Sequence, residues 1–120
     1  ITFTGWLEQD GVLEELIKAD SFVLSSRVEA QPISILEALS TGLPVVCTEV
    51  VPEAIVSDKE GIRVPVENIE ALADGMLRMI AERNKFDEKA ISERIASVAG
   101  PNTVTKSIIA IYEKVLQSRL

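Results

Sequence analysis

The stretch from residue 25 to residue 44 constrains the fold of this chain most strongly, because it contains a helix with both boundaries marked. Pro32 suits the first helical turn, where its fixed φ is helical and its missing N–H would have no intrahelical acceptor. Gly42 can adopt the left-handed conformation that ends a helix, and Pro44 cannot continue one. The sequence therefore predicts a helix over residues 32–41.

This helix is expected to be largely buried, because apolar side chains cover most of its circumference. Its polar positions form one narrow stripe at three- and four-residue spacing: Ser34, Glu37 and Thr41. Short apolar runs lie on either side of it, at residues 22–24 and 43–47. The order strand, loop, helix, strand predicts a parallel sheet covered by helices on both faces.

Two carboxylates in this stretch are candidate site residues. Glu37 lies on a mostly buried helix, where desolvation without hydrogen bonds is costly. Glu29 lies in the loop before the helix, near the unpaired N–H groups around Ile33 and Ser34, which attract anions. Ser26 follows a strand, at the edge where open α/β sheets place ligands. Spacing alone favours a plainer interpretation, in which Glu29 is a solvated loop residue and Glu37 an exposed helix position.

Composition excludes several classes of function. The net charge of −7 argues against a nucleic-acid-binding surface, which needs a basic stripe. The absence of histidine removes imidazole acid–base chemistry and the usual zinc sites, so catalysis would use carboxylates, backbone dipoles or groups outside this chain. No apolar run is long enough to span a bilayer, and the start does not resemble a signal peptide. A single cysteine, Cys47, in an apolar run fits a small core residue and a reducing, cytoplasmic location.

The N-terminal part is predicted to start with a strand over residues 1–4, which ends at a loop containing Gly5 and Trp6. A covering helix is expected to follow, with Asp10 as its N-terminal cap. Trp6 fits two interpretations equally well, as a residue that lines a pocket and as a packing residue at the domain edge.

The C-terminal part changes to helical periodicity after a last strand at residues 61–64. One helix is predicted to begin at Asn68, a second contains Ile91 and Ile95, and a closing amphipathic helix starts at Thr103. The predicted fold class is α/β, a three-layer Rossmann-like domain with a mainly parallel sheet and C-terminal helices.

The central stretch resembles the signature of the retaining, family-four (group 1) glycosyltransferases. That signature is a Glu, seven residues, a second Glu, then a small-residue helix that ends in Gly-x-Pro before a strand; here the carboxylates are Glu29 and Glu37. Ala30-Gln31 stands where the family usually has Gly-Phe. Other landmarks follow the family's order and approximate spacing, at residues 1–6, 19–26, 42–46 and 61–65.

The resemblance implies that residues 1–120 are the C-terminal, donor-binding domain of a two-domain enzyme of the GT-B type, without its first two strand–helix units. Such an enzyme transfers a sugar from a UDP-, GDP- or ADP-sugar, with retention of configuration and without a metal ion or cofactor. The acceptor, a sugar, lipid-linked sugar or polysaccharide, would bind an upstream domain, through which the enzyme could also attach peripherally to a membrane. The isolated chain is expected to be inactive and prone to associate.

The resemblance also implies roles for individual residues. Glu37 would bind the ribose of the donor, and Glu29 would act on the transferred sugar. The remaining donor-site residues would be Gly5, Trp6, Ser26, Gln31, Pro32, Ile33 and Ser34. The alternative function is a non-catalytic module that binds a nucleotide or sugar in the same pocket.

Overall fold

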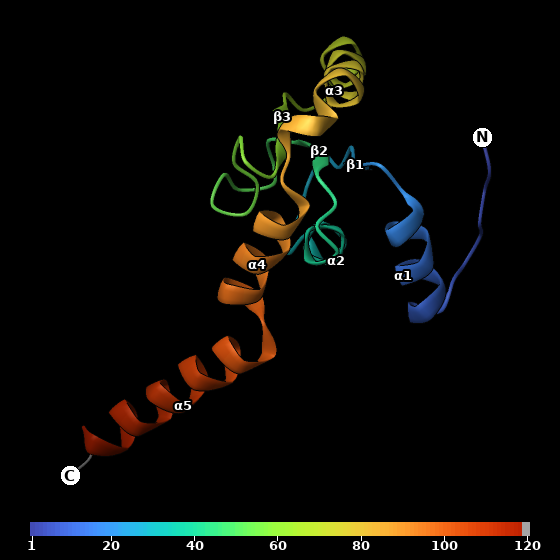
Figure 1. Cartoon of the computed structure of the whole chain (residues 1–120). Coiled ribbons are helices and arrows are strands. Elements are labelled where there is room, and N and C mark those ends of the chain that lie inside the picture. Colours follow the sequence, from blue (N-terminus) through green and yellow to red (C-terminus); the bar gives the residue numbers. More distant parts are fainter. Residues whose placement is uncertain (119–120) are drawn as a thin grey trace.

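The computed structural model of the protein describes residues 1–118 and contains a small parallel sheet with helices around it (Figure 1). The elements follow in the order α1 (Gln9–Lys18), β1 (Phe22–Leu24), α2 (Ile33–Ser40), β2 (Val45–Thr48), β3 (Gly61–Val64), α3 (Ile69–Glu82), the short 3-10 helix η1 (Arg83–Lys85), α4 (Glu88–Ala99) and α5 (Pro101–Gln117). The predicted α/β class is confirmed.

Strand β2 is the centre of the sheet, which has the order β1-β2-β3 with both pairings parallel. Its first residue, Val45, lies opposite Phe22 of β1 and Gly61 of β3. All four residues of β2 are buried, as expected for a parallel strand covered on both faces.

The side chains of β2 alternate between two apolar clusters, one on each face of the sheet. Cys47 contributes to the cluster formed with α2 and α4, whereas Val46 packs with Met79 of α3 on the other face. Helix α2 anchors the first cluster with side chains that are fully buried: Ile35, Ala38 and Leu39. Burial of a large aliphatic side chain contributes about 1.5–3 kcal/mol, so α2 is fixed firmly on the sheet. The predicted three layers are therefore present.

The boundaries of α2 agree with the sequence prediction to within one residue at each end. Pro32 is the N-cap residue and Thr41 the C-cap residue. Gly42 has a φ of 83°, the left-handed conformation that its position requires. The N–H of Leu43 then donates to the carbonyl of Ala38 at 3.1 Å, which closes the helix end and directs the chain into β2.

Two expectations for the N-terminal part are wrong. Residues 1–4 form no strand; Ile1 and Phe3 are exposed, and the segment runs along the outside of α1 (Figure 1). A strand needs a hydrogen-bonded neighbour, and within residues 1–118 this segment has none. Asp10 does not cap α1, because the helix already begins at Gln9 and Glu8 is its N-cap residue.

The C-terminal helices begin close to their predicted positions, but the last of them leaves the body of the molecule. The Asn68 side chain caps α3 by accepting from the N–H of Ala71 at 2.9 Å, as its position predicted. Helix α5 begins at Pro101, buries none of its described side chains and projects outward (Figure 1). The chain therefore has a radius of gyration of 16.8 Å, against roughly 14 Å for a compact domain of this length.

Replacement of Gly42 by alanine should strongly destabilise the fold. A Cβ atom at this position would lie 2.5 Å from the backbone oxygen of Glu88 and would also disfavour the left-handed φ. We expect Gly42→Ala to lower the free energy of unfolding by roughly 2–4 kcal/mol, measured by thermal or denaturant unfolding.

Gly11→Ala is the matched control for this substitution. Gly11 lies inside α1, and its Cβ would meet only the side chain of Leu7 at an ordinary contact distance of 3.5 Å. Alanine favours a helix over glycine by about 1 kcal/mol, so this variant should be neutral or more stable. Equal unfolding midpoints for the two variants would contradict the structural role of Gly42.

Candidate functional site

Glu29 is tethered at the edge of the sheet where the strands end. Ser26, two residues after β1, donates a hydrogen bond from Oγ to Oε1 of Glu29 at 2.5 Å. Thr48, the last residue of β2, donates from Oγ1 to the backbone carbonyl of Ser26 at 2.6 Å. Thr48 is buried, whereas Ser26 and Glu29 are half-buried. The carboxylate of Glu29 is therefore held in place and remains partly open to solvent.

The N-terminus of α2 follows this loop and offers fewer free donors than the sequence suggested. The N–H of Ile33 donates to the carbonyl of Gln31 at 2.9 Å, in a tight turn. The N–H of Ser34 has no acceptor within residues 1–118. Pro32 is buried, whereas Gln31 and Ile33 are exposed. Ser34 thus supplies the free donor of this turn, with the positive end of the helix dipole behind it.

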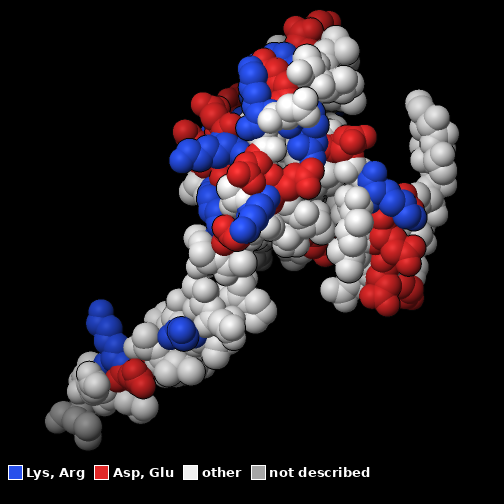
Figure 2. Space-filling model, viewed as in Figure 1, with Lys and Arg blue, Asp and Glu red and all other residues white. Residues whose placement is uncertain are grey.

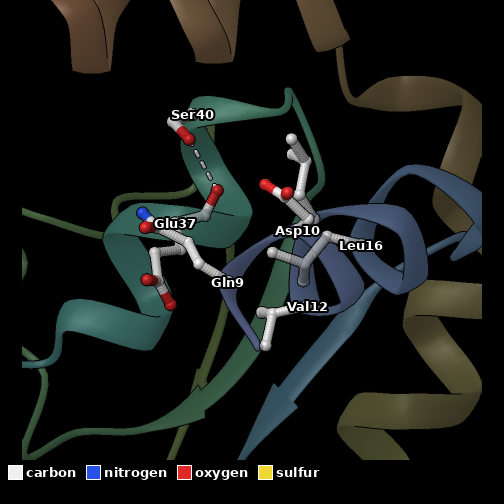
Figure 3. A pocket seen from close by; sticks show the side chains of 7 residues that line it. Gln9, Asp10, Val12, Leu16, Glu37 and Ser40 are labelled. Carbon is white, nitrogen blue, oxygen red and sulfur yellow. Dashed lines mark hydrogen bonds between the residues drawn. The ribbon is translucent and has the colours of Figure 1, made fainter. Parts of the chain in front are cut away.

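Glu37 lies on the exposed side of α2, so it does not need the protein partners expected for a buried carboxylate. It lines a cavity of about 390 Å³ between α1 and α2. In Figure 3, Glu37 and Ser40 line this cavity from α2, and α1 forms the opposite wall. The residues that α1 contributes are Gln9, Asp10, Val12, Leu13 and Leu16. We call this space the α1–α2 cavity.

Gly5 and Trp6 do not reach the α1–α2 cavity. Trp6 is 82% exposed, so it neither lines this cavity nor packs firmly at a domain edge. Gly5 has a φ of 65°, and a Cβ atom added to it would have no neighbouring atom within 4 Å, so the space beside Gly5 is open. The residues next in sequence, Gln9 and Asp10, line the cavity instead.

A second cavity, of about 230 Å³, lies at the carboxyl ends of the strands. Thr48 and Arg27 are among its lining residues, and Arg27 Nε pairs with Oε1 of Glu67 at 3.1 Å. Glu67 has a φ of 55°, a left-handed value that is uncommon outside glycine. Both charged side chains are mostly exposed, so their ion pair contributes little to stability. Neither Arg27 nor Glu67 was expected at this site from the sequence.

The structure also contains a buried carboxylate that the sequence analysis missed. Glu60 is 1% exposed; its Oε2 accepts hydrogen bonds from the N–H and Oγ of Ser57, and its Oε1 pairs with Arg94 Nε at 2.9 Å. Arg94 also donates to the carbonyls of Ala54 and Ile55. These bonds attach α4 to the loop before β3, so Glu60 is structural and is not part of the site. The three-residue spacing from Ser57 to Glu60, typical of a capping box, was the available signal.

No group of three or more potential metal ligands occurs within residues 1–118. Over the same residues, no helix is both long enough and apolar enough to cross a membrane. Charged side chains of both signs cover the sheet-containing body, whereas the surface of α5 is mostly uncharged in this view (Figure 2).

Cys47 lies close to the site but has the properties of a core residue. It is fully buried in β2, directly before Thr48. Burial raises the pKa of the thiol from 9.0 to about 11, and the charge of Arg63 offsets only part of that rise. The thiol is therefore protonated at neutral pH and unsuited to act as a nucleophile.

A known protein family matches more than half of this chain. The family model described as "Glycosyl transferases group 1" matches residues 1–82. The chain belongs to this family, which confirms the resemblance to group 1 glycosyltransferases found in the sequence.

Two individual proteins are similar to the chain. Sulfoquinovosyl transferase SQD2 from Arabidopsis thaliana is 39% identical over 61 residues, which cover 49% of this chain and 12% of that protein. The solved structure of sucrose-phosphate synthase from Thermosynechococcus elongatus superposes with a TM-score of 0.86 at 21% identity, over 98% of this chain and 30% of that one. The second match supports the Rossmann-like fold alone. The chain spans less than a third of the length of either protein.

The raised pKa of Cys47 gives a direct test of the packing around β2. At about pH 8 the native thiol should react with iodoacetamide at least roughly 100-fold more slowly than a free cysteine. The raised pKa lowers the fraction of thiolate, and burial keeps the reagent away from the sulfur. Mass spectrometry of samples quenched over time would measure the rate.

The same measurement in denaturant is the control, because it shows that the reagent is active at this pH. Unfolding should restore a rate typical of a free thiol, because the pKa then returns to its ordinary value. Rapid labelling of the native protein would show that β2 is not the buried central strand described above.

Proposed function

We propose that this chain is the donor-binding, C-terminal half of a longer, retaining glycosyltransferase of the GT-B type. The observation that supports this most strongly is the placement of two carboxylates around α2 in a chain of the group 1 family. Glu29 is tethered before the helix, and Glu37 lines the α1–α2 cavity. The substrate class would be a nucleotide-sugar, with a hexosyl group as the part transferred.

The electrostatics of α2 suit a nucleoside diphosphate as leaving group. Negative charge on the diphosphate grows as the glycosidic bond breaks. The N–H of Ser34 and the positive end of the helix dipole could stabilise that charge. Because these groups are fixed by the burial of α2 on the sheet, they need little reorganisation during the reaction.

Glu37 is suited to bind the ribose of the donor. Its carboxylate is exposed and lines a cavity of about 390 Å³, within the usual size range of small-molecule pockets. A carboxylate accepts hydrogen bonds from both hydroxyls of a ribose, and bonds of this charged type are stronger than neutral ones. Glu37 would thus fix the nucleoside in the α1–α2 cavity while the diphosphate extends toward Ser34.

Glu29 is suited to act on the transferred sugar, because it lies before the N-terminus of α2 whereas Glu37 lies further along the helix. Its partly exposed carboxylate could accept hydrogen bonds from sugar hydroxyls or stabilise developing positive charge at the anomeric carbon. We propose no metal ion or cofactor for this step, and we do not assign Glu29 as a nucleophile.

A non-catalytic module that binds a nucleoside or sugar is the alternative, and one observation favours it. The α1–α2 cavity is lined by Asp10 and Glu37 but, among residues 1–118, by no lysine or arginine. A diphosphate would find no cation there, whereas a nucleoside or neutral sugar needs none. Detection of sugar transfer by the full-length protein would exclude this alternative.

The ribose assignment predicts that Glu37→Ala weakens binding of a nucleoside diphosphate about 10- to 100-fold. Loss of charged hydrogen bonds costs about 1.5–3 kcal/mol, which corresponds to that range. Isothermal titration calorimetry on the full-length protein would measure the affinity, and thermal unfolding should change little because Glu37 is exposed.

Glu113→Ala on α5 is the matched control for Glu37→Ala. Glu113 is also an exposed helical glutamate, and it does not line the α1–α2 cavity. Its removal should leave the affinity unchanged. Unchanged affinity in Glu37→Ala as well would exclude the ribose role.

The assignment of Glu29 predicts a different result for Glu29→Gln. Glutamine keeps an oxygen that can accept the hydrogen bond from Ser26 but loses the charge. We expect kcat for sugar transfer to fall about 100-fold, while the affinity for the nucleoside diphosphate stays within about twofold. Steady-state kinetics and calorimetry of the full-length protein separate the two quantities. Equal losses in both would contradict the division of roles between Glu29 and Glu37.

A further inference from the structure

The end of β2 is connected to Glu29 by two consecutive hydrogen bonds. Thr48 Oγ1 donates to the backbone carbonyl of Ser26 at 2.6 Å, and Ser26 Oγ donates to Glu29 Oε1 at 2.5 Å. We infer that Thr48 is a positioning residue for Glu29 and acts through Ser26. This inference rests on the function proposed above for Glu29.

The hydroxyl of Thr48 fixes the loop at the point where the backbone ladder stops. The pairing of β1 with β2 ends with Leu24 opposite Cys47, so Ser26 lies beyond the last paired residue of β1. The side chain of Thr48 replaces the missing ladder bond and holds the carbonyl of Ser26 against the end of the sheet. Ser26 therefore starts the loop from a defined position.

The position of Thr48 is itself rigid. Its side chain is 3% exposed, and its backbone lies in the fully buried strand β2, opposite Val64 of β3. A buried hydroxyl needs a hydrogen-bond partner, and the carbonyl of Ser26 satisfies it. The two hydrogen bonds thus connect Glu29 to a rigid part of the core.

Ser26 is the only side chain within residues 1–118 that bonds the carboxylate of Glu29. The bond engages Oε1, so Oε2 remains available to a ligand. A carboxylate that contacts a reacting sugar must be held closely, because a displacement of about 1 Å can cost roughly 100-fold in rate. Loss of the Thr48 hydroxyl would release Ser26, and with it this single tether.

The test compares Thr48→Val with Thr48→Ser in the full-length protein. Valine keeps the buried volume but lacks the hydroxyl, whereas serine keeps the hydroxyl. We expect Thr48→Val to lower kcat about 5- to 20-fold with little change in the KM for the nucleotide-sugar or in nucleoside diphosphate affinity. Thr48→Ser should restore kcat to within about twofold of the original protein.

A double-mutant cycle separates positioning of Glu29 from a general structural effect. Thr48→Val should lower kcat much less when Glu29 is already glutamine, because the negative charge whose position matters is then already absent. An equal loss in both backgrounds, or no rescue by Thr48→Ser, would overturn the inference. Thermal unfolding of each variant controls for loss of the fold.

The cycle also distinguishes this inference from the proposed function. If Glu29→Gln lowers kcat but Thr48→Val does not, the proposed role of Glu29 stands and the role of Thr48 is wrong. If Glu29→Gln keeps full turnover, the proposed role of Glu29 fails, and the inference about Thr48 fails with it.

Discussion

The structure depends on one central strand whose backbone is hydrogen-bonded on both sides and whose side chains are buried on both faces. β2 pairs with β1 and β3, and each of its four residues is buried. Buried backbone groups must be paired, and apolar faces must be covered, so the strand requires both neighbours and both helical layers. Because parallel strands end at the same edge, this requirement also brings Ser26 and Thr48 together, where the candidate site lies.

Helix α2 links this core to the site. Successive residues of a helix are rotated by about 100°, so burial of Ile35 and Ala38 on the sheet side turns Glu37 outward. The same burial fixes where the helix begins, and hence where the free N–H of Ser34 lies. Gly42 closes the helix against the backbone of Glu88, so α4 also contributes to the placement of α2. The packing of the core thus determines the geometry of the site.

Local signals made much of this fold predictable. Pro32 and Gly42 mark the ends of α2, and Asn68 caps α3, because each acts on backbone groups within a few residues of itself. The strand predicted at residues 1–4 is absent because strand formation depends on a non-local partner. The exposure of α5 could not be predicted either, because it also depends on non-local contacts. The helical periodicity of the sequence shows which face is apolar but not what packs on it.

The candidate site was predictable only where it depends on local signals. The two-glutamate spacing identified α2, but not the cavity between α1 and α2, because the packing of two helices is a tertiary property. The network from Thr48 through Ser26 to Glu29 was hidden as well. It joins the last residue of β2 to two residues of the loop after β1. A contact between segments so far apart in the chain leaves no periodic pattern in the sequence. The burial of Glu60 against Arg94 was missed because the partners lie on separate elements.

The charge balance of the proposed donor site leads to one further step. A helix N-terminus carries about half a positive charge, whereas a nucleoside diphosphate carries roughly two or more negative charges. Of the cations near the site, Arg27 already pairs with Glu67, and the α1–α2 cavity itself is lined by Asp10 and Glu37. In the proposed site, residues 1–118 would therefore provide groups for the ribose and the sugar but little positive charge for the diphosphate. The proposed reaction would therefore require most of the positive charge that stabilises the leaving group to come from outside residues 1–118.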